Sequence, residues 1–276
     1  MTTKNSLSDY AGPLHSRVGG AFPGQRAVFR GHDLHRDLKD IRWLGLYLFG
    51  ITGHQFSEPQ LRVLDAIWTY TSYPDARLWN NRVAALAGST RSSGILGISA
   101  ALAVSEASIY GGQIIIAIAG FLEQAKQRNE SGETLETIVT QYLQEHRGIP
   151  GYGRPVRRMD IDERNGPILT LARQEGLADG PYVKLALQIE EILLSGRWRM
   201  RMNYAAMSAA LALDIGLTPQ DHYLYMLPVF LAGMPPCYRD ALNRPEGATF
   251  PLACTQIEYT GPRRRKRNND EQSRDD

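Results

Sequence analysis

The sequence has little cysteine. Among its 276 residues only Cys237 and Cys254 are cysteines, which is too few for a disulfide framework or a cysteine-rich zinc site. A protein with so few thiols is typical of a reducing compartment, so we expect a cytoplasmic protein. We also predict that each cysteine is a small buried hydrophobic residue rather than a reactive thiol.

Long apolar runs and an excess of one charge are lacking as well. No stretch reaches the ~20 apolar residues of a membrane-spanning helix, and the polar start Met1–Asp9 lacks the hydrophobic core of a signal peptide. The net charge of +2 says little about partners. Much of the excess lies in Arg263–Arg267, within a charged tail from about residue 263 that we expect to be disordered. A solvated tail is favoured over one that contacts nucleic acid or an anionic surface.

Several catalytic signatures are absent from the sequence. There is no Walker loop, no dinucleotide-binding glycine fingerprint, no Gly-x-Ser-x-Gly elbow and no cluster of metal ligands. The six histidines are scattered, and none has the spacing of a catalytic pair. We therefore expect no metal site.

Helical periodicity is what the sequence has in abundance. Ser57 before Pro59 and Thr218 before Pro219 are signals of capped helix starts. The segment Val83–Ala107 is rich in Ala, Gly and Ser and apolar almost all round, so it is predicted to form buried, closely packed central helices. The 43% apolar content and the length fit an all-α protein of one or two domains.

Other segments refine this prediction. An alternating pattern near Arg26–Arg30 predicts a short strand or hairpin over Ser16–Arg30, and the residues from Gly31 to Leu34 are expected to lead into a helix. Near the end of the chain, Asp221–Met234 is predicted to be one helix. Pro235-Pro236 is expected to interrupt it before a short last helix, Cys237–Leu242.

The most informative stretch is Ile149–Asn165. Gly151 and Gly153 bracket Tyr152, and glycine lets a ligand approach the backbone closely. The stretch also carries guanidinium groups, which pair with phosphate or carboxylate oxygens; these belong to Arg154, Arg157, Arg158 and Arg164. Composition alone favours a solvated loop between helices, with an anion-binding loop as the alternative.

The segment Gly151-Tyr152-Gly153-x-Pro155-Val156, with Asp162-Glu163-Arg164 after it, resembles the Gly-Phe-Gly-His-x-Val and Asp-Pro-Arg segment of the citrate synthase and citryl-CoA lyase superfamily. In that family the segment wraps the adenine end of coenzyme A, and its Arg contacts a substrate carboxylate. The resemblance implies a substrate-binding Arg164, and it puts Arg154 in place of the His that contacts the substrate oxygen. It implies that coenzyme A is bound by Gly151, Tyr152, Gly153, Arg157 and Arg158.

A second match is the turn Ser108-Ile109-Tyr110-Gly111-Gly112-Gln113. It resembles the Pro-Leu-His-Gly-Gly-Ala turn of citrate synthases, whose His polarises the thioester carbonyl. Here Tyr110 replaces that His, and a tyrosine hydroxyl can still donate a hydrogen bond to a developing enolate oxygen. A tyrosine packed at the start of a helix is an equally favoured alternative.

Two further positions follow from the resemblance. Met202-Asn203-Tyr204 is similar to the approach to the family's catalytic Asp, which places Asn203 nearest to that base. An amide is no base, although it can orient a thioester or a water. At the junction where the family has a substrate-binding His, that His falls at Pro74. The nearby Asn80, Asn81 and Arg82 are candidate substrate ligands, with helix capping as the explanation for one of the two Asn residues.

Motifs near both ends of the chain match as well, so the resemblance covers about residues 16–262. Arg30-Gly31-His32-Asp33-Leu34 resembles the Arg-Gly-Tyr-Asp-Leu that follows the small N-terminal hairpin of citrate synthases. Glu258-Tyr259-Thr260-Gly261-Pro262 resembles their Glu-Tyr-x-Gly-Pro end. Cys254-Thr255-Gln256 stands where the family has Arg-Pro-Arg, so a carboxylate-binding arginine is missing.

The resemblance implies a two-domain, citrate synthase-like helical fold with a short N-terminal β-hairpin. The large domain would comprise residues 1–110 and 206–276, and the small domain residues 111–205. It implies a homodimer joined through the central helices, with acyl-CoA and a small carboxylic acid such as oxaloacetate or citrate as ligands. The implied activity is acyl-CoA-dependent formation or cleavage of a carbon–carbon bond, as in an acyltransferase or lyase. The alternative is an inactive homologue that binds acyl-CoA or a partner subunit and regulates or scaffolds it.

Overall fold

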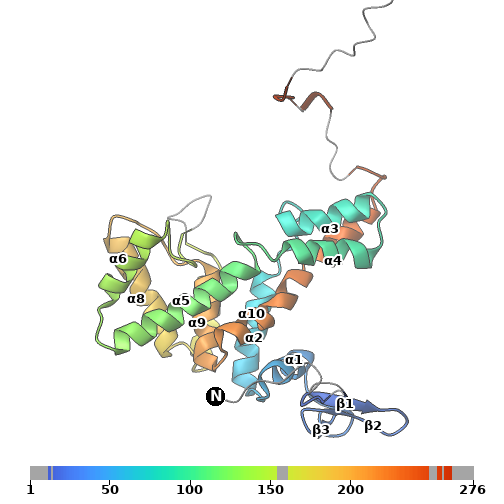
Figure 1. Ribbon diagram of the computed structural model, residues 1–276, viewed down its shortest axis with the longest axis horizontal. Coiled ribbons are helices and arrows are strands. Elements are labelled where there is room, and N and C mark those ends of the chain that lie inside the picture. The colour runs from blue at the N-terminus through green and yellow to red at the C-terminus, as the bar shows by residue number, and fades with distance from the viewer. Residues whose placement is uncertain (1–11, 14, 154–160, 249–253, 257, 263–276) are drawn as a thin grey trace, which may run out of the picture.

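The described part of the chain is helical apart from one small sheet, which confirms the all-α prediction with an N-terminal hairpin (Figure 1). The computed structural model describes residues 12–13, 15–153, 161–248, 254–256 and 258–262. The strands are β1 (Gly19–Phe22), β2 (Arg26–Phe29) and β3 (His32–Asp33). The helices are α1 (Trp43–Thr52), α2 (Glu58–Thr71), α3 (Trp79–Ser89), α4 (Gly94–Val104), α5 (Gly112–Glu130), α6 (Leu135–Glu145), α7 (Asn165–Gln174), α8 (Pro181–Ser195), α9 (Tyr204–Ile215), α10 (Pro219–Met226) and α11 (Met234–Leu242), with 3-10 helices η2 (Leu227–Leu231) and η3 (Cys254–Gln256).

The sheet is antiparallel in the order β1-β2-β3. Gly19 pairs with Phe29, and Phe22 with Arg26, across a tight turn. The expectation that the residues after Gly31 lead into a helix is wrong, because His32 and Asp33 pair with β2 instead. Arg30 and Gly31 both have positive φ, of 50° and 85°, and this reverses the chain so that it returns along β2.

Helix α9 forms the centre of the main core. Residues such as Ala206, Met207 and Ala210 are fully buried, because the helix is apolar on every side and α2, α5, α8 and α10 pack around it. Its alanines let those neighbours approach closely. The helix begins at Tyr204, so the loop before it lies against the centre of the core.

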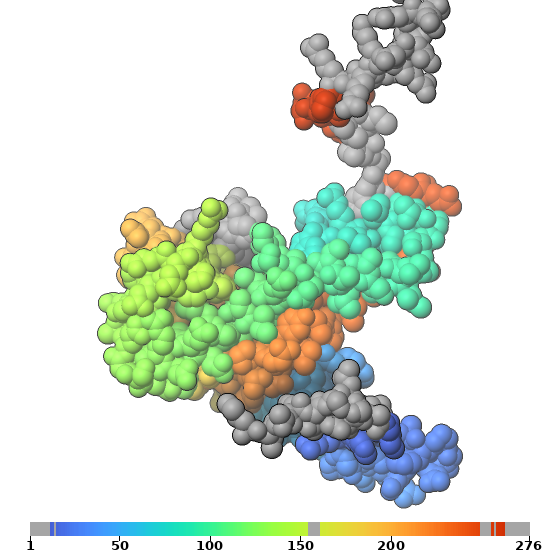
Figure 2. All heavy atoms as spheres, in the orientation of Figure 1, coloured from blue at the N-terminus to red at the C-terminus, as the bar shows by residue number. Residues whose placement is uncertain are grey.

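Helices α3, α4 and α11 form a separate layer that projects from the rest of the molecule (Figures 1 and 2). A Cβ on Gly88 would lie 2.4 Å from the Tyr238 carbonyl oxygen, so this glycine permits the close contact of α3 with α11. Ile95 and Leu96 on α4 are 81% and 67% exposed. The outer face of α4 is therefore exposed in a single chain, and its burial against a second chain stays a prediction.

Prolines near the end of the chain act differently from the prediction. The predicted helix Asp221–Met234 ends at Met226, because Pro228 lies at the start of the 3-10 helix η2. Pro235 and Pro236, by contrast, do not interrupt a helix. They occupy the first turn of α11, where a backbone N–H has no intrahelical partner and its absence costs nothing.

The signals at the helix starts predicted from the sequence are confirmed. Ser57 accepts from the Gln60 N–H in a capping box, and Thr218 does the same for Asp221. Cys237 is buried, as expected of a small hydrophobic residue, whereas the Cys254 side chain lies outside the described residues. Across the described segments, we find no helix with the length and apolar content needed to cross a membrane.

Candidate active site

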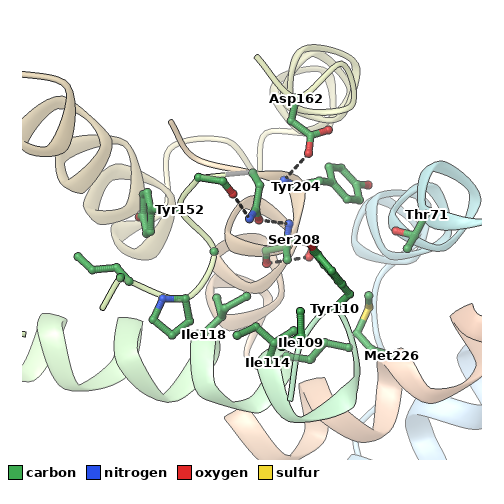
Figure 3. Close-up of a pocket in the computed structure, with 18 of the residues that line it drawn as sticks. Thr71, Ile109, Tyr110, Ile114, Ile118, Tyr152, Asp162, Tyr204, Ser208 and Met226 are labelled. Carbon is green, nitrogen blue, oxygen red and sulfur yellow. Dashed lines mark hydrogen bonds between the residues drawn. The ribbon is translucent and has the colours of Figure 1, made fainter. Parts of the chain in front are cut away.

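A cavity of about 700 Å³ brings together segments that are far apart in the sequence (Figure 3). Its wall comes from the end of α2, the residue before α3, the turn before α5 and the first two turns of α5, and the loop after α6. Asp162, Arg164 and the start of α9 with the residues before it form a further part of the wall. Met226 and Phe230 complete the wall. The cavity lining includes six of the residues singled out in the sequence, namely Tyr110, Gly151, Tyr152, Gly153, Arg164 and Asn203.

The glycine loop is locked onto the start of α9. Gly151 and Gly153 have φ values of +85° and +84°, a conformation that favours glycine. A Cβ on Gly151 would lie 2.6 Å from the Ala206 Cβ. The Gly151 carbonyl accepts from the Asn203 N–H at 2.9 Å, and the Gly153 N–H donates to the Arg201 carbonyl at 2.6 Å. The loop is therefore a fixed wall of the cavity and not a freely solvated connection.

Tyr152 has a role in packing. Its ring is buried in the core, and its hydroxyl donates to the Ala186 carbonyl of α8 at 2.9 Å. Burial raises the pKa of this hydroxyl well above its usual range. Tyr152 therefore holds the loop against α8, and a ligand at this position would meet its backbone.

Asn203 is the N-cap of α9. Its Oδ1 accepts from the Ala205 N–H at 3.0 Å and its Nδ2 donates to the Gly153 carbonyl at 3.1 Å. These contacts fix the amide beside the cavity, where it joins the glycine loop to the helix start.

Arg164 forms a two-point ion pair with Asp162. Arg164 Nε and Nη2 donate to the two carboxylate oxygens of Asp162, each at 2.8 Å, and Asp162 also accepts from the Tyr204 N–H at 2.9 Å. Burial alone would raise the pKa of Asp162, but the hydrogen bonds and charge of Arg164 hold that pKa below its usual range. Asp162 is thus a carboxylate that positions Arg164 and is a poor proton acceptor. It does not cap α7, which starts at Asn165 with Arg164 as its N-cap residue.

Tyr204 is a cavity residue that sequence reasoning missed. The Arg164 guanidinium carbon lies 4.6 Å from the centre of the Tyr204 ring and 5.4 Å from that of Tyr73. The Tyr204 hydroxyl is buried and has no hydrogen-bond partner within the described chain. Burial raises the pKa of this hydroxyl, so it stays protonated. Only the fold places the ring over Arg164, and an aromatic after Asn203 is indistinguishable in the sequence from a core residue.

Tyr110 lies at the mouth of the cavity in a strained conformation. Its φ is +61°, unusual for a residue with a side chain, and it is 53% exposed, so it is not packed in a core. Figure 3 shows its side chain among the cavity residues, between Ser208 and the isoleucines before and within α5. A Cβ on Gly111 would lie 2.3 Å from the Ser105 carbonyl oxygen, which explains the glycine at this position.

Three sequence candidates are not brought to the cavity. Asn80 Nδ2 donates to Ser105 Oγ at 3.2 Å, and Asn81 Nδ2 donates to the Tyr73 carbonyl at 2.7 Å. Both side chains are buried and join α3 to its neighbours. Arg82 is on the exposed side of α3 and does not line the cavity either.

The remaining candidates, Arg154, Arg157 and Arg158, lie outside the described residues. Within the described residues, no group of three or more His, Cys, Asp or Glu side chains is placed to hold a metal ion.

Comparison with solved structures identifies proteins of the same fold. The chain matches citryl-CoA lyase from Hydrogenobacter thermophilus with a TM-score of 0.81 and 19% identity, over 93% of this chain and 98% of that one. ATP citrate lyase from Methanothrix soehngenii, solved with citrate and coenzyme A, matches with a TM-score of 0.73 and 16% identity, over 93% of this chain and 43% of that one. Citrate synthase from Thermoplasma acidophilum, solved with carboxymethyl coenzyme A and oxaloacetate, matches with a TM-score of 0.60 and 18% identity, over 82% of this chain and 59% of that one. No protein-family model matches the sequence, and no curated protein does.

Proposed function

We propose a function on the premise that this chain has the fold of citrate synthase and citryl-CoA lyase, from which its sequence has diverged to 16–19% identity. The chain would be a divergent enzyme of that superfamily. It would make or break a carbon–carbon bond beside the thioester of an acyl-CoA, with a carboxylic acid such as oxaloacetate or citrate as the other reactant or product. The observation that carries the proposal is one cavity that holds Tyr110, Asn203, Arg164 and the glycine loop.

Tyr110 is proposed to donate its hydroxyl hydrogen bond to the thioester oxygen. Cleavage and formation of the bond both pass through an enolate of the acyl-CoA, whose charge gathers on that oxygen. A half-exposed tyrosine at the mouth of the cavity is free to reach a ligand. The strained backbone of Tyr110 supports this role, because strain of this kind gathers at functional sites.

Arg164 is proposed to hold a substrate carboxylate. The fork of its guanidinium is already aligned by Asp162 and by the rings of Tyr73 and Tyr204. A pre-aligned arginine loses little side-chain freedom on binding a ligand. Asn203 would orient the reacting carbon or a water, and Arg154 would take the place of the family's substrate-contacting His.

The glycine loop is proposed to bind coenzyme A. Gly151 and Gly153 lack side chains, so a ligand can approach the backbone of the loop. Arg157 and Arg158 would add charge for the phosphates of the cofactor. A large domain of residues 1–110 and 206–276 and a small domain of residues 111–205 are part of the proposal, and the cavity would then lie between the two domains.

The outer face of α4 is proposed to join two chains in a homodimer. Ile95 and Leu96 are exposed in the single chain, and a second copy would bury them. The low cysteine content supports a reducing cytoplasm as the compartment.

The test is binding followed by turnover. A ligand that binds only the folded protein stabilises it by about 2.7 kcal/mol at a hundredfold excess over Kd, so the melting temperature rises. We expect coenzyme A or an acyl-CoA to raise it, and oxaloacetate or citrate to raise it further. Release of the free thiol, or consumption of citryl-CoA, then measures turnover.

Each outcome has a definite meaning. Binding with turnover supports the enzyme. Binding without turnover under any pairing of acyl-CoA and acid favours the inactive homologue, which the replacement of the family's Asp by Asn203 would explain. No stabilisation by any coenzyme A species would contradict the proposal.

A further inference from the structure

The cavity has two unlike sides. Figure 3 shows Asp162 and Tyr204 on one side and Ile109, Ile114 and Ile118 together on the other. Leu78, Met226 and Phe230 also line the cavity. Ile114 and Ile118 are one turn apart on α5, so they face the cavity from the same side of the helix.

Part of this apolar lining faces water. Ile109 is 66% exposed, and Leu78 is also exposed. Isolated exposed hydrophobic residues are common on protein surfaces. These two border a cavity whose floor is formed by further isoleucines, and such a concave apolar lining with a few polar groups is typical of a ligand site.

The polar side carries few charges. The charged residues among the described lining are Arg147, Asp162 and Arg164. Because Asp162 pairs with Arg164 through both oxygens, much of the positive field of Arg164 is already compensated. Apart from these few charges, much of the described lining is a surface for a hydrocarbon group.

We propose that the apolar side of the cavity binds the acyl chain of the acyl-CoA, and that this chain is a hydrocarbon several carbons longer than acetyl. The proposal rests on the proposed function, because Tyr110 places the thioester and the neighbouring Ile109 then meets the first carbons of the acyl group. Ile114, Ile118 and Met226 would enclose the carbons beyond.

The test is a calorimetric series of free CoA, acetyl-CoA, butyryl-CoA, hexanoyl-CoA and octanoyl-CoA. Burial of each methylene is worth about 0.8 kcal/mol, so affinity should rise about fourfold per added carbon until the cavity is full. Equal affinities across the series, or tightest binding of acetyl-CoA, would overturn the inference while CoA binding itself stands. If neither free CoA nor any thioester binds, the proposed function fails and the inference fails with it.

A pair of variants tests where the acyl chain binds. Ile109→Asn should remove most of the gain from acetyl-CoA to butyryl-CoA, because Ile109 meets the first carbons, and leave the affinity for free CoA within about twofold. Ile109 is mostly exposed, so its replacement should not unfold the protein. Ile116→Asn is the matched control, because Ile116 is an exposed isoleucine of α5 that does not line the cavity. A gain from acetyl-CoA to butyryl-CoA that survives in Ile109→Asn, or that both variants lose equally, would overturn the placement.

Discussion

At the scale of one residue, Arg164 shows that a motif can identify a residue without predicting the side chains that surround it. The resemblance points to a carboxylate-binding arginine, and the fold places that arginine between two tyrosine rings and a buried aspartate. The aspartate fixes the direction of the fork and lowers the net charge that a ligand meets. Such an arginine suits one carboxylate group of a ligand.

Tyr110→Phe tests the proposed hydrogen bond to the thioester oxygen. The ring and the exposure stay the same, so we expect an unchanged melting temperature. Because loss of one oxyanion donor costs about a hundredfold or more in turnover, kcat should fall by about that factor with little change in KM. Tyr142→Phe on α6, away from the cavity, is the control. Full activity in Tyr110→Phe would remove this residue from the mechanism.

His222 should make the protein sensitive to acid. Burial lowers its pKa from 6.5 to about 4, so the folded protein holds it neutral while the unfolded chain takes up a proton below about pH 6.5. The contribution to stability is complete above pH 6.5 and is lost as the pH falls towards 4. The loss should amount to about 3 kcal/mol.

Urea unfolding between pH 7 and pH 4 measures this loss. In His222→Gln, which does not titrate, the free energy of unfolding should fall less steeply over that range. His35→Gln, at an exposed histidine, should keep the slope of the parent protein. If His222→Gln and the parent show the same slope, the buried histidine is not the cause.

At the scale of elements, Gly151→Ala and Gly153→Ala distinguish two reasons for a glycine in the loop, a positive φ and a close contact with α9. Both positions have φ near +85°, so each alanine should cost about 1 kcal/mol of backbone strain. At Gly151 the new Cβ would also meet the Ala206 Cβ at 2.6 Å, whereas at Gly153 the nearest atom is 3.6 Å away. Gly151→Ala should therefore destabilise the protein by about 1–3 kcal/mol more than Gly153→Ala does. Equal losses in urea unfolding would show that the loop can move away from α9.

The elements that the sequence predicted are those with local signals. Helices α2 and α10 start at the N-cap residues Ser57 and Thr218, each followed by a proline in the first turn. Such a start can be predicted because a cap depends on neighbours within one turn. The pairing of β3 with β2 depends on backbone conformations at Arg30 and Gly31 that no periodicity encodes. The end of α10 had a local signal in Pro228, and the apolar run around it concealed the break.

The candidate site divides in the same way. Tyr110, Asn203 and Arg164 were found through motifs, and the fold brings all three to one cavity. Tyr204, the Asp162–Arg164 pair and the isoleucine side of the cavity depend on contacts between distant segments. Asn80 and Asn81 resemble ligands in sequence, but their partners prove to be Ser105 and backbone carbonyls.

At the scale of the whole molecule, the exposed layer of α3, α4 and α11 argues for a second chain. A stable interface buries about 1,200–2,000 Å² in total, and α4 presents the exposed Ile95 and Leu96 in its first turn. We therefore expect a dimer at micromolar concentration in sedimentation velocity. The double variant Ile95→Asp with Leu96→Asp should be monomeric, since it places four charges in an apolar interface. Ile116→Asp, which exposes the same chemistry on α5, should leave the dimer intact. A monomeric parent protein, or a double variant that still dimerises, would show that α4 is not the contact.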